Sequence, residues 1–296
     1  MKNIFSLTSV LLLMVSSFSL AQSNGEGGWR VREKQIRISN PEYITQLRDL
    51  KINLDFYGPA HDHITAYVTP EELNQIELLG IPYIVEIEDL NSYYKDFWLR
   101  LDAYHSYQQI IELADSLAGA FPSICKKYIF GYSVQNRQCI ALKISDNVAV
   151  DEPEPEVMFD GGIHGDEIGG SENLIRFARD LCLNYGVDPA ITNLIDTREI
   201  WLYVMVNPDG RYNMSRYNAN SVDLNRDWGY MWDEWGGSPG AFSQIETRNL
   251  RDFMYDNQFV VYTSYHSGTQ IISYPWSYRP DACPDQSHVN QLAHSV

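Results

Sequence analysis

Residues 157–170 read VMFDGGIHGDEIGG, a short apolar run that passes directly into a glycine-rich loop containing His164 and Glu167. An apolar run of this length, bounded by glycines, is consistent with a buried strand. Glycine permits sharp backbone turns, so the imidazole and the carboxylate, three residues apart, can face one common point. The stretch therefore predicts a strand whose carboxyl end presents two metal-binding side chains.

A second apolar run, residues 259–262, leads to His266 in the segment YHSGTQ. Open α/β sheets bind ligands at the carboxyl ends of their strands, so we expect His266 to meet His164 and Glu167 there. Two histidines and a glutamate form a common ligand set of catalytic zinc, which keeps a fourth position open. We predict that these three residues hold one Zn²⁺ ion. Taken singly, either histidine is more simply interpreted as a hydrogen-bonded structural residue.

Between the two runs, residues 216–226 read RYNANSVDLNR and supply two guanidinium groups and an amide. A planar guanidinium binds a carboxylate through two parallel hydrogen bonds, and it also stabilises negative charge on a carbonyl oxygen. Arg216, Asn225 and Arg226 are therefore candidates to bind a substrate anion and carbonyl beside the metal. This combination indicates a metal hydrolase.

Further short motifs follow one another in order: YHSY at residues 104–107, GYS at 131–133, NPDG at 207–210, VDLNR at 222–226 and ETR at 246–248. Together with Pro122, Arg137, GGIHGDE at 161–167, HS at 266–267 and YP at 274–275, they resemble the M14 zinc carboxypeptidases, the family of carboxypeptidases A and B. The resemblance covers roughly residues 101 to 296.

By this resemblance, the three predicted metal-binding residues match the zinc ligands of the family. Arg216 matches the arginine that polarises the scissile carbonyl, and Asn225 with Arg226 matches the pair that binds the terminal carboxylate of the substrate. The resemblance implies a secreted zinc metallocarboxypeptidase that hydrolyses the C-terminal peptide bond of peptides and proteins through a zinc-activated water.

The chain departs from the family pattern at its end. Family members use a downstream glutamate as general base, preceded by a tyrosine, but the sequence stops at Val296, 30 residues after His266. Because the last residues have helical spacing without a stop signal, we expect a fragment that lacks the base and the residues that set side-chain specificity. Two smaller departures are Asp166, where many digestive members carry arginine, and Gly268, where many carry tyrosine.

Other charged residues near the motifs receive simpler interpretations. Asp166 and Glu246 are internal acids that could replace the missing base, but neither is assigned this role. The side chain of Asp166, between two ligands, is expected to point away from the metal, and Ser243 and Glu246 have the spacing of a helix capping box. Arg211 and Arg251 are interpreted as surface residues that pair with acids.

The beginning of the chain predicts export. Lys2 precedes an apolar stretch that ends in Ser19-Leu20-Ala21, so residues 1–21 are predicted to be a signal peptide and the protein secreted or periplasmic. A membrane anchor is the weaker alternative, because serines interrupt the stretch. The net charge of −17, from 22 basic and 39 acidic residues, argues against nucleic acid as a partner. The four cysteines allow three pairings, and none is assigned.

Residues 29–88 predict a small α+β unit of ferredoxin-like type, with strands over 30–38, 63–68 and 82–87 and helices over 41–50 and 69–79. We interpret it as a pro-segment that acts in cis, with residues 89–100 as connector; a plain accessory domain is the alternative. Residues 101–296 are predicted to be the catalytic domain, incomplete at its C-terminus.

Helical and strand patterns alternate within residues 101–296 and predict an α/β fold, a mixed β-sheet flanked by helices. The predicted strands cover residues 126–130, 138–145, 157–159, 199–206 and 259–264, and the predicted helices cover 105–121, 171–184, 244–256 and a last one from 284. Two other functions are compatible with the same residues. One is a zinc deacylase or amidase acting on N-acyl amino acids or cell-wall peptides, and the other is a noncatalytic module that binds C-termini.

Overall fold

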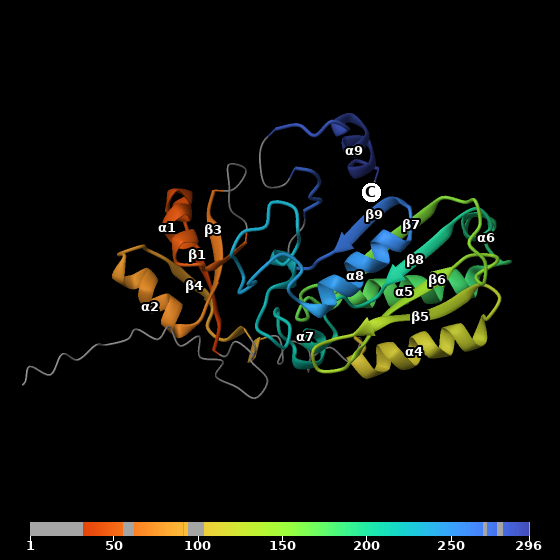
Figure 1. Cartoon of the computed structure of the whole chain (residues 1–296), viewed down its shortest axis with the longest axis horizontal. Coiled ribbons are helices and arrows are strands. Elements are labelled where there is room, and N and C mark those ends of the chain that lie inside the picture. Colours follow the sequence, from red (N-terminus) through yellow and green to blue (C-terminus); the bar gives the residue numbers. More distant parts are fainter. Residues whose placement is uncertain are drawn as a thin grey trace, which may run out of the picture.

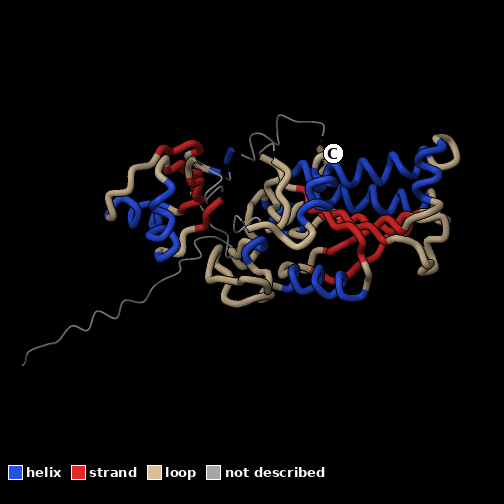
Figure 2. The backbone as a smooth tube through the Cα atoms, turned by 90° about the horizontal axis from the view of Figure 1, so that it is seen from above, coloured by secondary structure: helices blue, strands red, loops and turns tan. Residues whose placement is uncertain are grey.

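A computed structural model of the chain describes residues 32–55, 62–90, 92–93, 104–268, 271–276 and 281–295. The predicted signal peptide and most of the predicted connector lie outside these ranges. Two sheets occur in the described residues, one with four strands and one with five. Each sheet has its own helices, and the two units lie side by side along the long axis of the molecule (Figures 1 and 2).

The N-terminal unit, residues 32–90, is an antiparallel sheet in the order β2-β3-β1-β4, with two helices. Its elements are β1 (Lys34–Ile38), η1 (Pro41–Tyr43), α1 (Ile44–Asp49), β2 (Asn53–Asp55), β3 (Ile64–Val68), α2 (Pro70–Leu78) and β4 (Ile84–Ile87). The order of helices and strands is that of the predicted ferredoxin-like unit. Strand β2 was not predicted, because three residues are too few to show a periodic pattern.

The core of the N-terminal unit is formed by the inward side chains of its strands and by Leu47 and Ile76 of its helices. Thr69 starts α2 with the predicted capping box, in which its hydroxyl accepts from the Glu72 amide and Glu72 accepts from the Thr69 amide. One member of this core comes from the other unit: Trp235, only 6% exposed. The two units therefore share a hydrophobic cluster.

The larger unit contains the mixed sheet that the sequence predicted. Its elements are α4 (Tyr107–Ala120), β5 (Cys125–Tyr132), β6 (Gln138–Ile144), β7 (Glu156–Gly161), α5 (Ile168–Asn184), α6 (Pro189–Ile195), β8 (Glu199–Tyr203), α7 (Pro208–Asn213), η2 (Leu224–Arg226), α8 (Ile245–Asp256), β9 (Phe259–Tyr265) and α9 (Gln286–Ala293). The strand order is β5-β6-β8-β7-β9; β7 pairs in parallel with β8 and β9, and the other pairs are antiparallel. The short helices α6 and α7 were not predicted.

Side chains alternate across this sheet, and each face is covered by helices (Figure 2). Ile140 and Leu142 of β6 face α4 and α5, whereas Cys139 and Ala141 of the same strand face α8. Both faces are thus buried at the inner strands β6 and β8, whereas the edge strand β9 exposes Val260 and Tyr262. No helix in the described ranges is long and apolar enough to cross a membrane.

The start of α8 differs from the capping box predicted for Ser243 and Glu246. The helix begins at Ile245, and the buried carboxylate of Asp227 takes the place of the cap: it accepts hydrogen bonds from the Ser243 and Gln244 amides at 3.1 and 2.9 Å. Glu246 instead points into the protein and accepts from the backbone amide of Val134 at 3.1 Å. The prediction was wrong because an acceptor remote in sequence outcompeted the local one.

Asp227 also accepts from three hydroxyl groups, those of Ser238, Ser243 and Thr247, at 2.5–2.6 Å. We expect Asp227→Ala to lower the free energy of unfolding by about 3 kcal/mol, because it removes the buried acceptor of five hydrogen bonds. Ser243→Ala should cost only about 1 kcal/mol, since it removes a single donor. Urea unfolding of both variants measures the difference, and equal losses would restore the capping-box interpretation.

Candidate metal and substrate site

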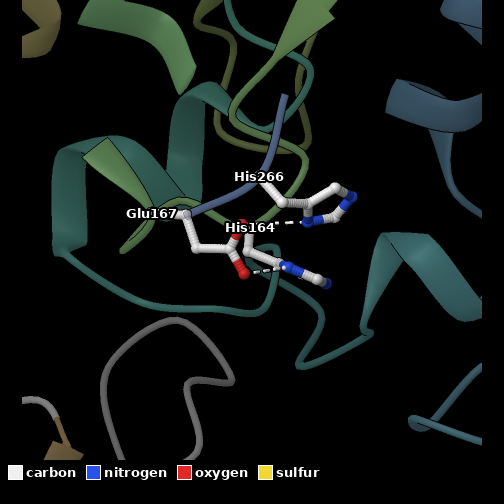
Figure 3. Close-up of side chains that lie close together, drawn as sticks. All are labelled: His164, Glu167 and His266. Carbon is white, nitrogen blue, oxygen red and sulfur yellow. Dashed lines mark hydrogen bonds and ion pairs between the residues drawn. The ribbon is translucent and has the colours of Figure 1, made fainter. Parts of the chain in front are cut away.

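The structure brings the three predicted metal-binding side chains together. The Nδ1 atoms of His164 and His266 lie 2.6 and 2.9 Å from the two carboxylate oxygens of Glu167 (Figure 3). One ligand atom from each residue lies within 4.8 Å of the others. Two imidazole nitrogens and a carboxylate are the donor set of a catalytic zinc site, so these residues fit a zinc ion.

Strand pairing explains this convergence. Strands β7 and β9 are parallel neighbours, and their last residues, Gly161 and Tyr265, are partners in the register. The chain therefore leaves both strands at the same edge, where His266 follows β9 directly and His164 follows β7 after a tight loop. A side chain at Gly165 in this loop would lie 1.9 Å from the backbone of Gly210, so only glycine fits there.

A fourth residue, Asp223, holds His164 from the other side. Its Oδ1 atom lies 3.1 Å from Nε2 of His164, while its Oδ2 atom accepts from Nε of Arg216 at 2.9 Å. A carboxylate on the outer nitrogen of a histidine fixes the ring orientation and strengthens it as a metal ligand. The sequence prediction included Asp223 in the motif VDLNR but gave it no role.

The charges of the site are strongly coupled in the metal-free chain. Burial and Arg216 disfavour a charged His164, but the carboxylates of Glu167 and Asp223 outweigh them and raise its pKa to about 9. Burial also opposes ionisation of Glu167, yet the two histidines hold its pKa well below the usual range. Burial, together with the neighbouring Glu167, raises the pKa of Asp166 to about 7.

Arg216 lies beside the metal-binding group and is 4% exposed. Its Nη1 atom lies 3.6 Å from Glu167, and its Nε atom is held by Asp223. The Nη2 atom is buried and makes no hydrogen bond within the described part of the chain. Asp223 thus fixes the guanidinium while one N–H donor group stays available.

Asn225 and Arg226 lie in the short helix η2, whose N-cap residue Asp223 accepts a hydrogen bond from the Asn225 amide at 2.9 Å. The guanidinium of Arg226 donates to the carbonyls of Asn225 and Leu54, at 3.2 and 2.6 Å. Its Nε atom is buried without a hydrogen bond among the described residues. One carboxylate, that of Asp223, therefore positions His164, Arg216 and the helix that carries Arg226.

The loop that carries Arg216 is fixed by the motifs at 131–137 and 207–210. Asp209 is fully buried and accepts from the Ser133 hydroxyl at 2.6 Å and from Arg137 at 2.7 Å. Asn207 caps α7 and donates to the backbone carbonyl of Arg216 at 3.3 Å. These motifs connect the β5–β6 hairpin to the site.

Two other arginines can be compared with their predicted surface positions. Arg251 forms the predicted ion pair, with Asp252 at 2.7 Å. Arg211 is not at the surface: it is 3% exposed and donates to the backbone carbonyl of His105, and burial lowers its pKa to about 10. Its place inside the protein was missed because a carbonyl partner far away in sequence leaves no local pattern.

The N-terminal unit reaches into the site through β2 and β3. Asn53 donates to Asp223 at 3.1 Å, and Asp55 lies 3.7 Å from Nη2 of Arg216. The ring of Tyr67 lies over the Arg216 guanidinium, 4.4 Å from the ring centre. No local sequence pattern marks these residues of the N-terminal unit as part of the site.

Comparison with known proteins identifies the family. The family model described as zinc carboxypeptidase matches residues 110–296. The chain belongs to the zinc carboxypeptidase family. Its relatives include carboxypeptidase D of Homo sapiens, 31% identical over 225 residues, and carboxypeptidase A1 of Bos taurus, 27% identical over 301 residues. The matches cover 70% and 86% of this chain, but 15% of carboxypeptidase D and 71% of carboxypeptidase A1.

Solved structures agree on the fold. Carboxypeptidase A from Helicoverpa armigera matches with a TM-score of 0.72 at 19% identity, over 90% of this chain and 77% of that one. Thrombin-activatable fibrinolysis inhibitor matches with a TM-score of 0.63 at 19% identity, over 89% of this chain and 79% of that one. The sequence-based resemblance and the prediction of a mixed sheet between helices are both confirmed, and zinc is the cofactor of this family.

We expect His266→Ala to lower the affinity for Zn²⁺ by more than about 100-fold, because it removes a ligand. Asp223→Asn should lower the affinity by about 10- to 100-fold, because it weakens the hydrogen bond that orients His164. Competition with a chromophoric chelator measures both. The matched control is His288→Ala, since His288 is exposed on α9 and lies outside the group. Unchanged affinity in His266→Ala would contradict the assignment.

Proposed function

We propose that the chain is part of an exported zinc metallocarboxypeptidase precursor that releases C-terminal residues from peptides and proteins. The observation that carries this proposal is the placement of Arg216 beside the metal-binding group and of Arg226 in the helix capped by Asp223, each with a buried nitrogen that makes no hydrogen bond within the described residues. Leaving a buried N–H group without a partner costs about 1–3 kcal/mol, which a bound substrate oxygen would recover.

The proposed roles follow from the chemistry of each group. When bound, zinc supplies a Lewis acid that polarises the scissile carbonyl and activates water. Arg216, fixed by Asp223, donates to the carbonyl oxygen as negative charge develops on it. Arg226 and Asn225 bind the terminal carboxylate of the substrate, which restricts cleavage to the last peptide bond.

We further propose that the N-terminal unit is a pro-segment that keeps the site closed. Leu54 occupies one donor of Arg226, and Asp55 and Tyr67 lie against Arg216. These contacts involve the two guanidinium groups that a substrate needs. Burial of Trp235 and an ion pair between Arg48 and Asp233 at 2.9 Å hold the unit in this position.

The role of Arg226 predicts a specific change in substrate preference. Arg226→Gln should reduce kcat/KM by about 100-fold for peptides with a free C-terminal carboxylate, because a charge-assisted bidentate contact is lost. The corresponding peptide amides should be poor substrates of both proteins. The experiment uses the zinc-loaded product of the complete reading frame and compares each peptide with its amide.

Three outcomes would contradict parts of this proposal. Equal cleavage of peptide and amide by the wild type would contradict the proposal that Arg226 binds the terminal carboxylate. Cleavage of N-acyl amino acids with peptides untouched would favour a deacylase or amidase. Zinc-dependent binding of C-terminal carboxylates without turnover would favour a noncatalytic binding module. Arg251→Gln, a surface variant on α8, serves as the control for loss of one positive charge.

Masking by the N-terminal unit predicts activation by cleavage between residues 88 and 104. Limited proteolysis there, followed by dilution, should raise kcat/KM by at least about tenfold, because the peptide substrate no longer competes with the docked N-terminal unit for the two arginines. Asp55→Ala should raise the activity of the uncut chain in the same direction. The two measurements together test masking, and a cut, diluted protein with unchanged activity would contradict it.

A further inference from the structure

Two of the four cysteines lie in one hydrophobic core of the larger unit. Cys125 is the first residue of β5, and Cys182 lies in the last turn of α5. Both residues are almost fully buried, at 1% and 2% exposure, and both belong to the cluster that the sheet forms with α4 and α5. The metal and substrate site uses neither of them.

The topology brings these two cysteines to the same end of the sheet. Strand β5 is antiparallel to β6, β6 is antiparallel to β8, and β8 is parallel to β7. The start of β5 therefore lies at the end opposite to the metal-binding group, which follows the end of β7. Helix α5 begins at that group, with Glu167 as its N-cap, and runs back along the sheet, so its last turn reaches the same far end (Figure 1).

The two sulfur atoms are in contact. The thiol of Cys125 donates a hydrogen bond to the sulfur of Cys182, which raises the pKa of Cys125 and lowers the pKa of Cys182. Two cysteines can be bridged without movement of the backbone only when their side chains approach each other, and this pair meets that condition.

The other two cysteines lie elsewhere. Cys139 belongs to the core on the opposite face of the sheet, where its sulfur accepts from Asn249 at 3.6 Å. Cys283 precedes α9 and, as far as the structure describes the chain, belongs to neither core of the larger unit. Cys125 and Cys182 are thus the pair that the fold places together.

We propose that Cys125 and Cys182 form a disulfide in the exported protein. The bond is independent of the proposed peptidase activity and rests on the proposed export to an oxidising compartment. One cysteine thiolate attacks a small-molecule or protein disulfide and expels a thiolate, and the second cysteine thiolate then attacks the mixed disulfide and expels the other. The two cysteines lose two electrons and two protons, which convert the oxidant disulfide into two thiols.

The disulfide joins an edge strand to the helix that follows the metal-binding loop. Strand β5 is at one edge of the five-stranded sheet and pairs with β6. The loop that the bond closes contains both His164 and Glu167. Because a cross-link stabilises mainly by restricting the unfolded chain, and more so for a long loop, the bond stabilises the part of the fold that presents these two side chains.

Mapping of the thiols tests the proposal without measuring catalysis. The full chain is refolded in a mixture of oxidised and reduced glutathione, unfolded in the presence of iodoacetamide and digested without reduction. We expect a cross-linked peptide that contains Cys125 and Cys182. Alkylation of both residues, or a peptide that joins either of them to Cys139 or Cys283, would overturn the proposal.

Thermal unfolding measures the effect of the bond. Refolding with a phosphine reductant in place of glutathione should lower the Tm of the wild type by about 10 °C, because the long loop is no longer closed. Zinc is added to every sample after the redox reagents have been removed. The variant Cys125→Ala/Cys182→Ala should have the same Tm after both treatments. The control Cys139→Ala, which lacks a buried cysteine of the other core, should keep the wild-type difference.

Two further results separate this proposal from the others. An equal fall in Tm in the double variant would assign the effect to other groups and contradict the role of this pair. Retention of the chain inside the cell would count against the proposed export alone, because glutathione supplies the oxidant in the refolding experiment.

Discussion

The arrangement of the site depends on one buried carboxylate, that of Asp223. Its two oxygens contact Nε2 of His164, Nε of Arg216 and the amide of Asn225. Because Asp223 is fully buried, these donors are needed to keep it charged, and they hold its pKa well below the usual range. The same carboxylate contacts a proposed metal ligand, the arginine proposed to polarise the carbonyl and the helix proposed to bind substrate, which ties their positions together.

The fold explains why the sequence predicted the metal-binding group more readily than its supports. His164 and His266 follow apolar runs that become the parallel neighbours β7 and β9, and a local pattern therefore marks both. Asp223 and Tyr67 are placed by contacts across the chain, which leave no period in the sequence. Sequence patterns predicted long strands that are buried on both faces, such as β6, whereas β2 was too short to show a recognisable pattern.

The two wrong predictions have a common physical cause. Glu246 and Arg211 were interpreted from residues close to them in the chain, as a cap and as a surface ion pair. In the structure each is buried, and its partner comes from another element: the amide of Val134 for Glu246 and the carbonyl of His105 for Arg211. Burial of polar groups is decided by tertiary hydrogen bonds, and local spacing does not encode them.

The indole of Trp235 bears on the masking proposed for the N-terminal unit. It lies in the core of the N-terminal unit although it belongs to the other one, so separation of the two units exposes a large apolar surface to water. While the linker is intact, this contact operates at the millimolar effective concentration of a tethered partner. Once the linker is cut, the same contact becomes a bimolecular one, so the proposed masking of the site would weaken as the protein is diluted. Under the proposed export and masking, a concentrated pool of the cleaved protein would therefore stay inactive for longer than a dilute one.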